Sequence, residues 1–313
     1  MSEPARPATM EPVKLLTGVL VLQIVLAGTL TALVATDNVP FVSGQDGRDG
    51  NEAQAAVPRA TSKHFNSRAA YNSVKRQVAL GPRPAGSAAS KELAERLRRA
   101  LPGGRFQAVP GGLRNVIGVV PGKTKRIVVV GAHYDTKELP GFVGANDGAA
   151  GTAVMVQLAR TIKPRTLKPT LVFIAFDGEE APAGVPDADF AAEGLRGSKV
   201  AAKRYKNASA MVLLDFIGQR NLRLMADASA DSDLWAKVRT AGRKAGVGRV
   251  FPSDVQGSVQ DDHTPFLRQG VPAVDLIDFD YACFHRTCDN VAQIHEPSLD
   301  ATGETMMKLL PTL

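Results

Sequence analysis

The sequence predicts an α/β fold: a single domain with a central mixed, mostly parallel sheet flanked by helices. Short apolar and β-branched segments, such as residues 170–176, alternate with amphipathic segments of helical period. Acidic residues and histidines recur where the apolar segments end. With 313 residues, of which 44% are hydrophobic and 22% charged, the chain can bury a core of this kind.

The amino-terminal segment differs from the expected domain. Residues 15–35 are almost entirely apolar and have about the length of a membrane-spanning helix. Lys14 precedes this run and Asp37 follows it, so the positive-inside bias places residues 1–14 in the cytoplasm. We therefore expect a single-pass anchor in the cell membrane, with the domain outside the cytoplasm. The alternative is a cleaved signal peptide and a secreted domain, although residues 33–35 make a poor cleavage site.

A linker and two helices are expected next. Residues 36–60 are rich in Gly, Asp, Asn, Gln and Ala without periodicity, which is typical of a linker. The domain then occupies residues 61–313. Its first elements are helices at residues 62–78 and 88–101, joined by the turn-rich connector 81–87.

The remaining pattern alternates strands with helices. Strands are expected at residues 115–120 and 126–130, and the turn residues 121–124 predict a hairpin between them. Later strands are expected at residues 170–176, 210–214 and 271–277, and later helices at 152–162, 194–205, 231–245, 263–268 and 298–310. This order predicts a mainly parallel sheet covered on both faces.

The basic residues do not indicate a nucleic-acid partner. The formal net charge is +7, which is mild for this length. Lys and Arg are dispersed among the helices, and no basic stripe carries interleaved aromatic residues. We therefore expect solvated faces and no nucleic-acid binding.

The only two cysteines, Cys283 and Cys288, lie close together near the carboxyl end. Disulfides persist in exported domains, and this spacing closes a small loop. The pair flanks His285, so metal ligation is the alternative. A lone pair of cysteines is not a zinc-finger spacing, so we expect a disulfide.

The strand expected at residues 170–176 ends on Asp177, Gly178 and the adjacent acids Glu179 and Glu180. In α/β proteins the carboxyl edge of the sheet is where ligands bind. Adjacent residues on an extended backbone point in opposite directions, so one glutamate can bind a metal while the other faces a substrate. The alternative is a solvated turn after the strand.

Similar side chains follow other expected strands: His133, Asp135, Asp147, Asp215 and His285. Taken singly, Asp147 could cap a helix, His133 could be a core histidine, and Asp215 could end its strand in solvent. Together at successive strand ends, carboxylates and imidazoles suit zinc, which in catalytic sites takes three protein ligands and leaves one position open. We therefore predict a zinc site at this edge of the sheet.

Several ordered motifs resemble the M28 class of zinc aminopeptidases and the related glutaminyl-peptide cyclotransferases. They are residues 131–136 (Gly-Ala-His-Tyr-Asp-Thr), 144–148 (Gly-Ala-Asn-Asp-Gly), 176–180 (Phe-Asp-Gly-Glu-Glu), 212–215 (Val-Leu-Leu-Asp) and 262–267 with 270–272. The resemblance runs from about residue 81 to the carboxyl end. It implies Glu179 as the general acid/base and a zinc held by Asp147, Glu180 and His285. In two-metal members, a second zinc would be held by Asp147, His133 and Asp215.

The cyclotransferase branch is the closer resemblance. Residues 133–137 are similar to its first motif, which includes Asp135, and Asp261 with Asp262 replaces the single acid common in aminopeptidases. The resemblance implies that Asp215 and Asp261 form a buried acid network beside Glu179 instead of a second metal site. Cyclotransferases usually carry Trp just before the last zinc-binding histidine, where this chain has Phe284.

The resemblance implies an enzyme that acts on peptide or protein N-termini. As a cyclotransferase it would use zinc to polarise the side-chain carbonyl of an N-terminal glutamine, while Glu179 carries a proton from the α-amine to departing ammonia. As an aminopeptidase it would use Glu179 to deprotonate the water that attacks the first peptide bond. A non-catalytic anchored binding domain is the third alternative, and the complete ligand set argues against it.

Overall fold

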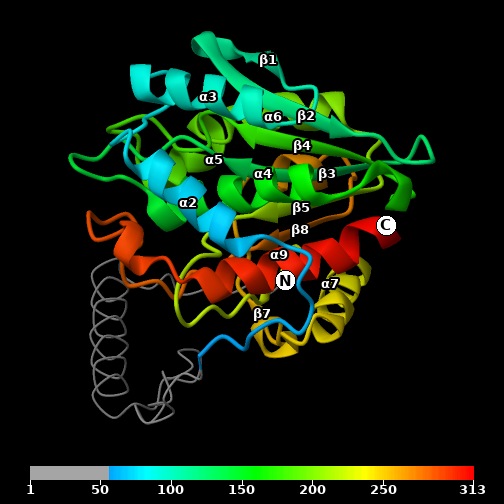
Figure 1. Ribbon diagram of the computed structural model, residues 1–313. Helices are drawn as coiled ribbons and strands as arrows, with labels where there is room; N and C mark the ends of the chain where they lie inside the picture. The colour runs from blue at the N-terminus through cyan, green and yellow to red at the C-terminus, as the bar shows by residue number, and fades with distance from the viewer. Residues whose placement is uncertain (1–55) are drawn as a thin grey trace, which may run out of the picture. The chain divides into compact units, whose positions relative to one another are not determined.

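The central sheet of the computed structural model, which describes residues 56–313, has six strands (Figure 1). They are β1 (Arg105–Val109), β2 (Leu113–Val120), β3 (Ile127–His133), β4 (Thr170–Phe176), β5 (Ala210–Leu214) and β8 (Ala273–Leu276), in the order β1-β2-β4-β3-β5-β8. The pairs β4–β3, β3–β5 and β5–β8 are parallel, whereas β1–β2 and β2–β4 are antiparallel. The predicted mixed sheet is thus confirmed. A small second sheet joins β6 (Ala226–Asp227) and β7 (Val255–Gln256) in parallel.

The expected hairpin at residues 121–124 is wrong. β4 lies between β2 and β3, so these two strands are not neighbours. Their connection crosses the segment that enters β4, where the N–H of Lys123 donates to the carbonyl of Leu167 (3.2 Å) and that of Thr124 to Lys168 (2.9 Å). Turn residues set a change of chain direction, whereas the choice of strand partner depends on which apolar faces are buried.

Helices cover both faces of the sheet (Figure 1). One layer contains α2 (Ser67–Val78), α3 (Ala88–Ala100), α4 (Gly151–Thr161), α7 (Ser232–Lys244) and α9 (Glu296–Leu309), and the other contains α6 (Arg196–Arg204) and α8 (Thr264–Leu267). Alternate strand residues divide between the two cores. In β3, Val128 and Val130 pack with the first layer, whereas Val129 packs with the second. Burial on both faces explains why these strands read as continuous apolar runs.

Helix α2 begins at Ser67, later than expected from the sequence. The side chain of Asn66 caps the helix by accepting a hydrogen bond from the N–H of Ala69 (2.9 Å). The preceding residues are not helical, and buried Glu304 holds them by accepting a hydrogen bond from the N–H of Phe65 (2.6 Å). Val57, from the last residues of the expected linker, is buried in the core.

The predicted membrane anchor at residues 15–35 and the cytoplasmic residues 1–14 lie outside the described part of the chain, as does the linker as far as residue 55. Across residues 56–313, no helix combines the length and the apolar composition that a bilayer crossing requires.

Candidate metal and catalytic site

The predicted site residues gather at the carboxyl ends of the parallel strands. His133 ends β3, the two adjacent glutamates follow β4, and Asp215 follows β5. Two further residues arrive on connections: Asp147 from the irregular turn before α4, and His285 from the loop after β8. The fold thus brings to one edge residues that are up to 152 positions apart (133 to 285) in the sequence.

Asp147, Glu180 and His285 form one potential ligand group. His285 Nε2 lies 3.5 Å from Asp147 Oδ2 and 3.4 Å from Glu180 Oε1. One ligand atom from each residue lies within 4.8 Å of the other two. Asp147 Oδ2 and Glu180 Oε1 are buried and accept no hydrogen bond from any described residue, which is costly unless a cation lies between them. Two carboxylates and one imidazole fit zinc with an open coordination position.

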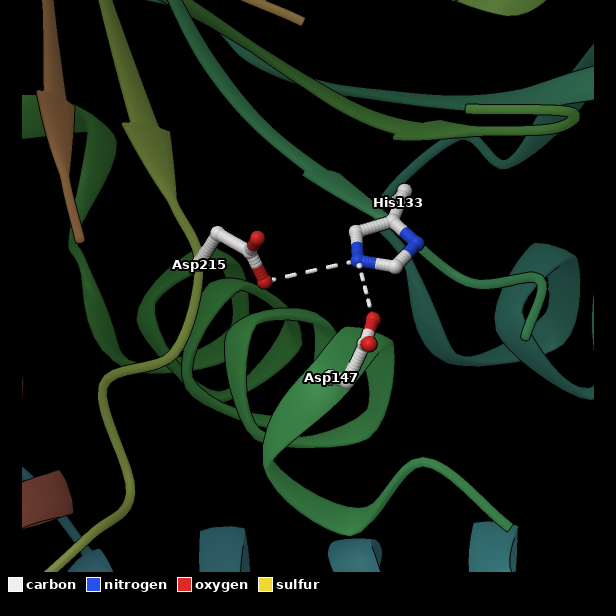
Figure 2. Close-up of side chains that lie close together, drawn as sticks. All are labelled: His133, Asp147 and Asp215. Atoms are coloured by element: carbon white, nitrogen blue, oxygen red, sulfur yellow. Dashed lines mark ion pairs between the residues drawn. The ribbon is translucent and has the colours of Figure 1, made fainter. Parts of the chain in front are cut away.

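His133, Asp147 and Asp215 form a second group (Figure 2). His133 Nε2 lies 3.2 Å from Asp147 Oδ1 and 3.3 Å from Asp215 Oδ1. Asp147 therefore directs one carboxylate oxygen to each group. Burial alone would lower the pKa of His133, but Asp215, Asp135 and Asp147 raise it well above the usual value. The arrangement provides either ligands for a second cation or a closed set of ion pairs beside a single one.

The turn that carries Asp147 is held by contacts that the sequence motifs did not predict. The carboxylate of Asp289 accepts hydrogen bonds from the N–H groups of Asn146 (2.8 Å) and Asp147 (3.1 Å). Gly148 has φ +90°, and a Cβ there would lie 2.8 Å from the carbonyl oxygen of Asp135. The alternative that Asp147 caps α4 is wrong, because the residue before α4 is Ala150 and no side chain caps it. The Asp147 carboxylate is therefore free to take part in both ligand groups.

Arg83 supports the same turn from inside the protein. Its guanidinium is completely buried and donates to the carbonyls of Val143 (2.8 Å) and Gly144 (3.2 Å). Burial lowers the pKa of Arg83 to about 10, although the charge of Asp147 opposes that shift. This role of Arg83 could not be predicted from the sequence, because a single arginine in a Pro-rich connector has no periodicity or spacing to distinguish it.

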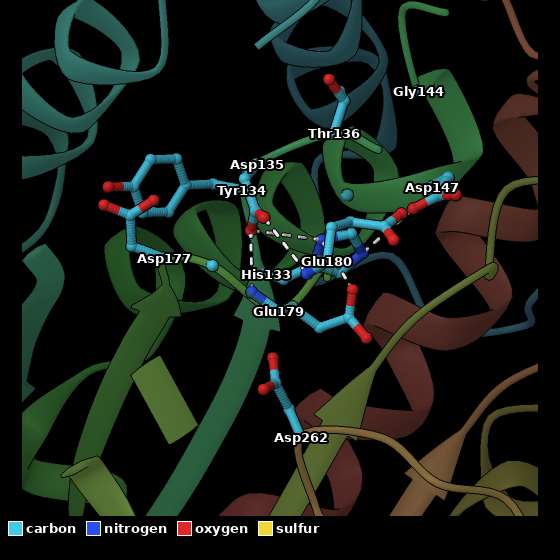
Figure 3. Close-up of polar contacts among 12 residues, drawn as sticks. His133, Tyr134, Asp135, Thr136, Gly144, Asp147, Asp177, Glu179, Glu180 and Asp262 are labelled. Atoms are coloured by element: carbon cyan, nitrogen blue, oxygen red, sulfur yellow. Dashed lines mark hydrogen bonds and ion pairs between the residues drawn. The ribbon is translucent and has the colours of Figure 1, made fainter. Parts of the chain in front are cut away.

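The turn after β4 separates the two glutamates (Figure 3). The carboxylate of Asp135 accepts one hydrogen bond from the N–H of Glu179 and one from the N–H of Glu180, each 3.2 Å long. Gly178 has φ +71°, and a Cβ there would lie 2.7 Å from Leu113. The solvated-turn alternative is wrong, because Glu179 is only 7% exposed and Glu180 only 4%.

Buried acids surround Glu179. Burial raises its pKa well above the usual value, and the charges of Glu180, Asp261 and Asp262 add to that effect. Burial likewise raises the pKa of Asp215 to about 7. Asp215 and Asp261, which the resemblance placed in a buried acid network, are both buried, and so is Asp262. The raised pKa brings the Glu179 carboxyl closer to the pH range in which a general acid/base is most effective.

A pocket of about 230 Å³ opens over these residues and has aromatic walls. Phe284 stacks on His285, with ring centroids 3.9 Å apart and planes 23° apart. Phe190, from the short helix α5 (Phe190–Glu193) in the long loop after Glu180, also lines the pocket. Phe190 was not predicted, because its place at the pocket depends on how the loop folds back.

The predicted disulfide between Cys283 and Cys288 is confirmed. It brackets His285, which has φ +49°, a conformation that is unfavourable for a residue with a side chain. The covalent loop therefore helps to hold this imidazole toward Asp147 and Glu180.

Replacing both cysteines by serine should weaken zinc binding about tenfold, which is within the range for lost outer-shell support. The unfolding temperature should change little, because a ring this short restricts the unfolded chain only weakly. Competition with a chelating dye measures the zinc affinity. An unchanged affinity in the Cys283→Ser, Cys288→Ser protein would show that the disulfide does not position His285.

These features are typical of one class of protein, the metal-dependent enzymes that have their site at the carboxyl edge of an open α/β sheet, with a carboxylate beside the ligands. A sequence model of Peptidase family M28 matches residues 115–310, and the chain belongs to this family. The resemblance derived from the motifs is thereby confirmed.

The chain is similar both to proteins named as glutaminyl cyclases and to one named as a zinc-dependent exopeptidase. The glutaminyl-peptide cyclotransferase of Drosophila melanogaster is 30% identical over 217 residues, which cover 59% of this chain and 61% of the fly protein. The chain thus spans less than two thirds of that relative's length. Glutaminyl cyclase from Porphyromonas gingivalis has a TM-score of 0.71 at 26% identity, covering 80% and 99% of the two chains. A Zn-dependent exopeptidase from Parabacteroides distasonis has a TM-score of 0.71 at 27% identity, covering 82% and 100%.

Proposed function

We propose that this chain is a zinc enzyme that cyclises the N-terminal glutamine of peptides and releases ammonia. The observation that supports the proposal most is the position of Glu179, which is buried among Glu180, Asp261 and Asp262 directly beside the ligand group. The similarity to cyclotransferases from several animals points the same way. Aminopeptidase activity is the second candidate, because His133, Asp147 and Asp215 form a second ligand group.

In the proposed reaction, a zinc ion held by Asp147, Glu180 and His285 would polarise the side-chain carbonyl of the glutamine. Glu179 takes a proton from the substrate's α-amine, whose nitrogen attacks the side-chain carbonyl carbon. The carbon–nitrogen bond of the side-chain amide then breaks, and Glu179 returns the proton to the departing ammonia. Glu179 thus acts first as a base and then as an acid, which a raised pKa favours.

In the aminopeptidase alternative, the same Glu179 deprotonates a water that attacks the first peptide bond. Because the position of Glu179 serves both reactions, the products must decide between them. The full-length protein with zinc should be incubated with a Gln-initiated and a Leu-initiated peptide, and both peptides followed by mass spectrometry. Loss of the mass of ammonia from the Gln peptide alone supports cyclisation, whereas loss of a terminal residue from either peptide contradicts it. No change in either peptide would favour the non-catalytic binding domain.

The pH profile should show that Glu179 is influenced by its acidic neighbours. Because Glu179 must be deprotonated to accept the amine proton, kcat/KM should fall as the pH drops through its raised pKa. Asp261→Asn removes a negative charge that raises this pKa, so the acid limb should move to lower pH. The substrate amine titrates identically in both assays, so the difference between the two profiles reports the enzyme. If the acid limb of the Asp261→Asn profile lies at the same pH as that of the wild type, Asp261 does not raise the pKa of Glu179.

We also propose that residues 15–35 anchor the enzyme in the cell membrane with the domain outside the cytoplasm. The support is the apolar length of this run and the basic residues before it. Fractionation of intact cells, with protease added outside, tests the proposal. The anchor predicts a membrane-bound domain that external protease digests, whereas a free domain in the medium would indicate a cleaved signal peptide.

A further inference from the structure

A second hollow lies between α2, α3 and α4, on the helical layer of the fold. Its volume is about 340 Å³, at the lower end of the range for ligand pockets. It shares no lining residue with the pocket over the two ligand groups. We call it the arginine groove, after its rim residues Arg76, Arg96, Arg99 and Arg160.

The floor of the arginine groove is apolar. Leu93 and Leu97 of α3 lie opposite Val156 of α4, and all three side chains are more than nine-tenths buried. The groove is therefore not a simple gap filled by charged side chains. Its floor offers an apolar surface next to a charged rim.

The rim carries positive charge that the protein does not neutralise. Arg76, Arg99 and Arg160 come from three different helices, are exposed, and form no ion pair within residues 56–313. Only Arg96 is paired, with Glu92. No acidic side chain is found among the described residues that line the groove. Like charges around a shared hollow repel one another unless an anion lies between them.

We propose that the arginine groove binds the headgroup of an anionic phospholipid, with the first carbons of one acyl chain on the apolar floor. Guanidinium groups bind phosphate through two parallel hydrogen bonds, and the rim offers several of them. A small soluble anion would contact only the rim, whereas the acyl carbons of an amphiphile would also contact the apolar floor. The proposal also rests on the membrane anchor proposed for residues 15–35, which 20 residues (36–55) separate from the first described residue, Ala56.

Native mass spectrometry of the full-length protein, released from an uncharged detergent, tests this proposal. The probes are phosphatidylglycerol, phosphatidylcholine, inorganic phosphate and an acidic peptide. One phosphatidylglycerol per chain should bind well above the level of phosphatidylcholine. Arg76→Gln with Arg160→Gln should weaken that binding about 30-fold, as expected for two basic contacts to an anionic lipid.

A matched control carries Arg165→Gln and Arg249→Gln, which remove two exposed arginines outside the groove. Its phosphatidylglycerol affinity should equal that of the wild type. Both double variants should keep the zinc content and peptide activity of the wild type, which shows that they are folded. Equal binding of both lipids, equal loss in the control, or phosphate or the acidic peptide binding as tightly as phosphatidylglycerol would each overturn the proposal.

Discussion

Replacing Glu179 by glutamine should lower kcat on a Gln-initiated peptide about 100- to 10,000-fold, which is the range for loss of a general acid/base. The change preserves the shape of the side chain but removes the group that carries the proton. Glu179 belongs to neither ligand group, so the zinc content per chain should stay at the wild-type value. Steady-state kinetics and metal analysis on the same preparation measure both quantities.

The matched control for this variant is Glu193→Gln, an exposed glutamate in the loop after Glu180. It should retain the wild-type kcat and zinc content. A Glu179→Gln protein that keeps more than a tenth of the wild-type kcat would remove Glu179 from the chemistry. Loss of zinc from that protein would make the residue a ligand instead.

Replacing the neighbouring Glu180 by glutamine should lower the zinc content, which the change at Glu179 leaves unaltered. The change removes one of the three ligands in the group with Asp147 and His285, so zinc affinity should fall more than about 100-fold, beyond the cost of losing an outer-shell partner. It also leaves Lys137, whose Nζ lies 3.3 Å from Glu180 Oε2, without its ionic partner. Activity should disappear because the metal is absent.

Thermal unfolding with and without zinc measures this second effect. Zinc at 1,000 times its Kd should stabilise the wild-type fold by about 4.1 kcal/mol. At the same zinc concentration, a site at least 100-fold weaker in Glu180→Gln should give at most about 1.4 kcal/mol. The Glu193→Gln protein again serves as control. An undiminished zinc-dependent rise in Tm for Glu180→Gln would contradict the assignment of the ligands.

The site residues that directly follow a strand could be predicted from the sequence. Apolar β-branched runs followed directly by acids placed Glu179, Glu180 and Asp215 at the sheet edge, because these runs identify the strands and their alternation with helices predicts a parallel sheet. His285 is different, since the loop that carries it has no regular structure. The strand pattern predicted only that His285 lies at this edge, whereas its pairing with Asp147 and Glu180 was implied by family resemblance, because the path of such a loop depends on tertiary contacts.

Other parts of the fold could not be predicted, because they depend on contacts between distant segments. β1 pairs at the sheet edge and has partly exposed residues, so it lacks a strong apolar period. The insertion of β4 between β2 and β3 reflects which faces are buried and not the turn at residues 121–124. The turn at Asp147 is supported by Arg83, 64 positions earlier in the sequence, and by Asp289, 142 positions later. Local sequence patterns do not indicate contacts over such separations.

The arginine groove is another feature that depends on contacts between distant segments and could not be predicted from the sequence. In the sequence, Arg76, Arg99 and Arg160 belong to three separate amphipathic segments and read as ordinary solvated faces. Packing of α2, α3 and α4 places them around one hollow. Charge that is dispersed along a chain can thus be concentrated on a surface.

In the reaction that we propose, the substrate's own amine attacks the side-chain carbonyl carbon and no water takes part. This mechanism is tested most directly by incubating the full-length zinc-loaded protein with one Gln-initiated peptide in heavy-oxygen water and weighing the products. Cyclisation predicts a peptide of unchanged length that has lost the mass of ammonia and contains no heavy oxygen. Free glutamine carrying heavy oxygen, together with a peptide shortened by one residue, would contradict the account.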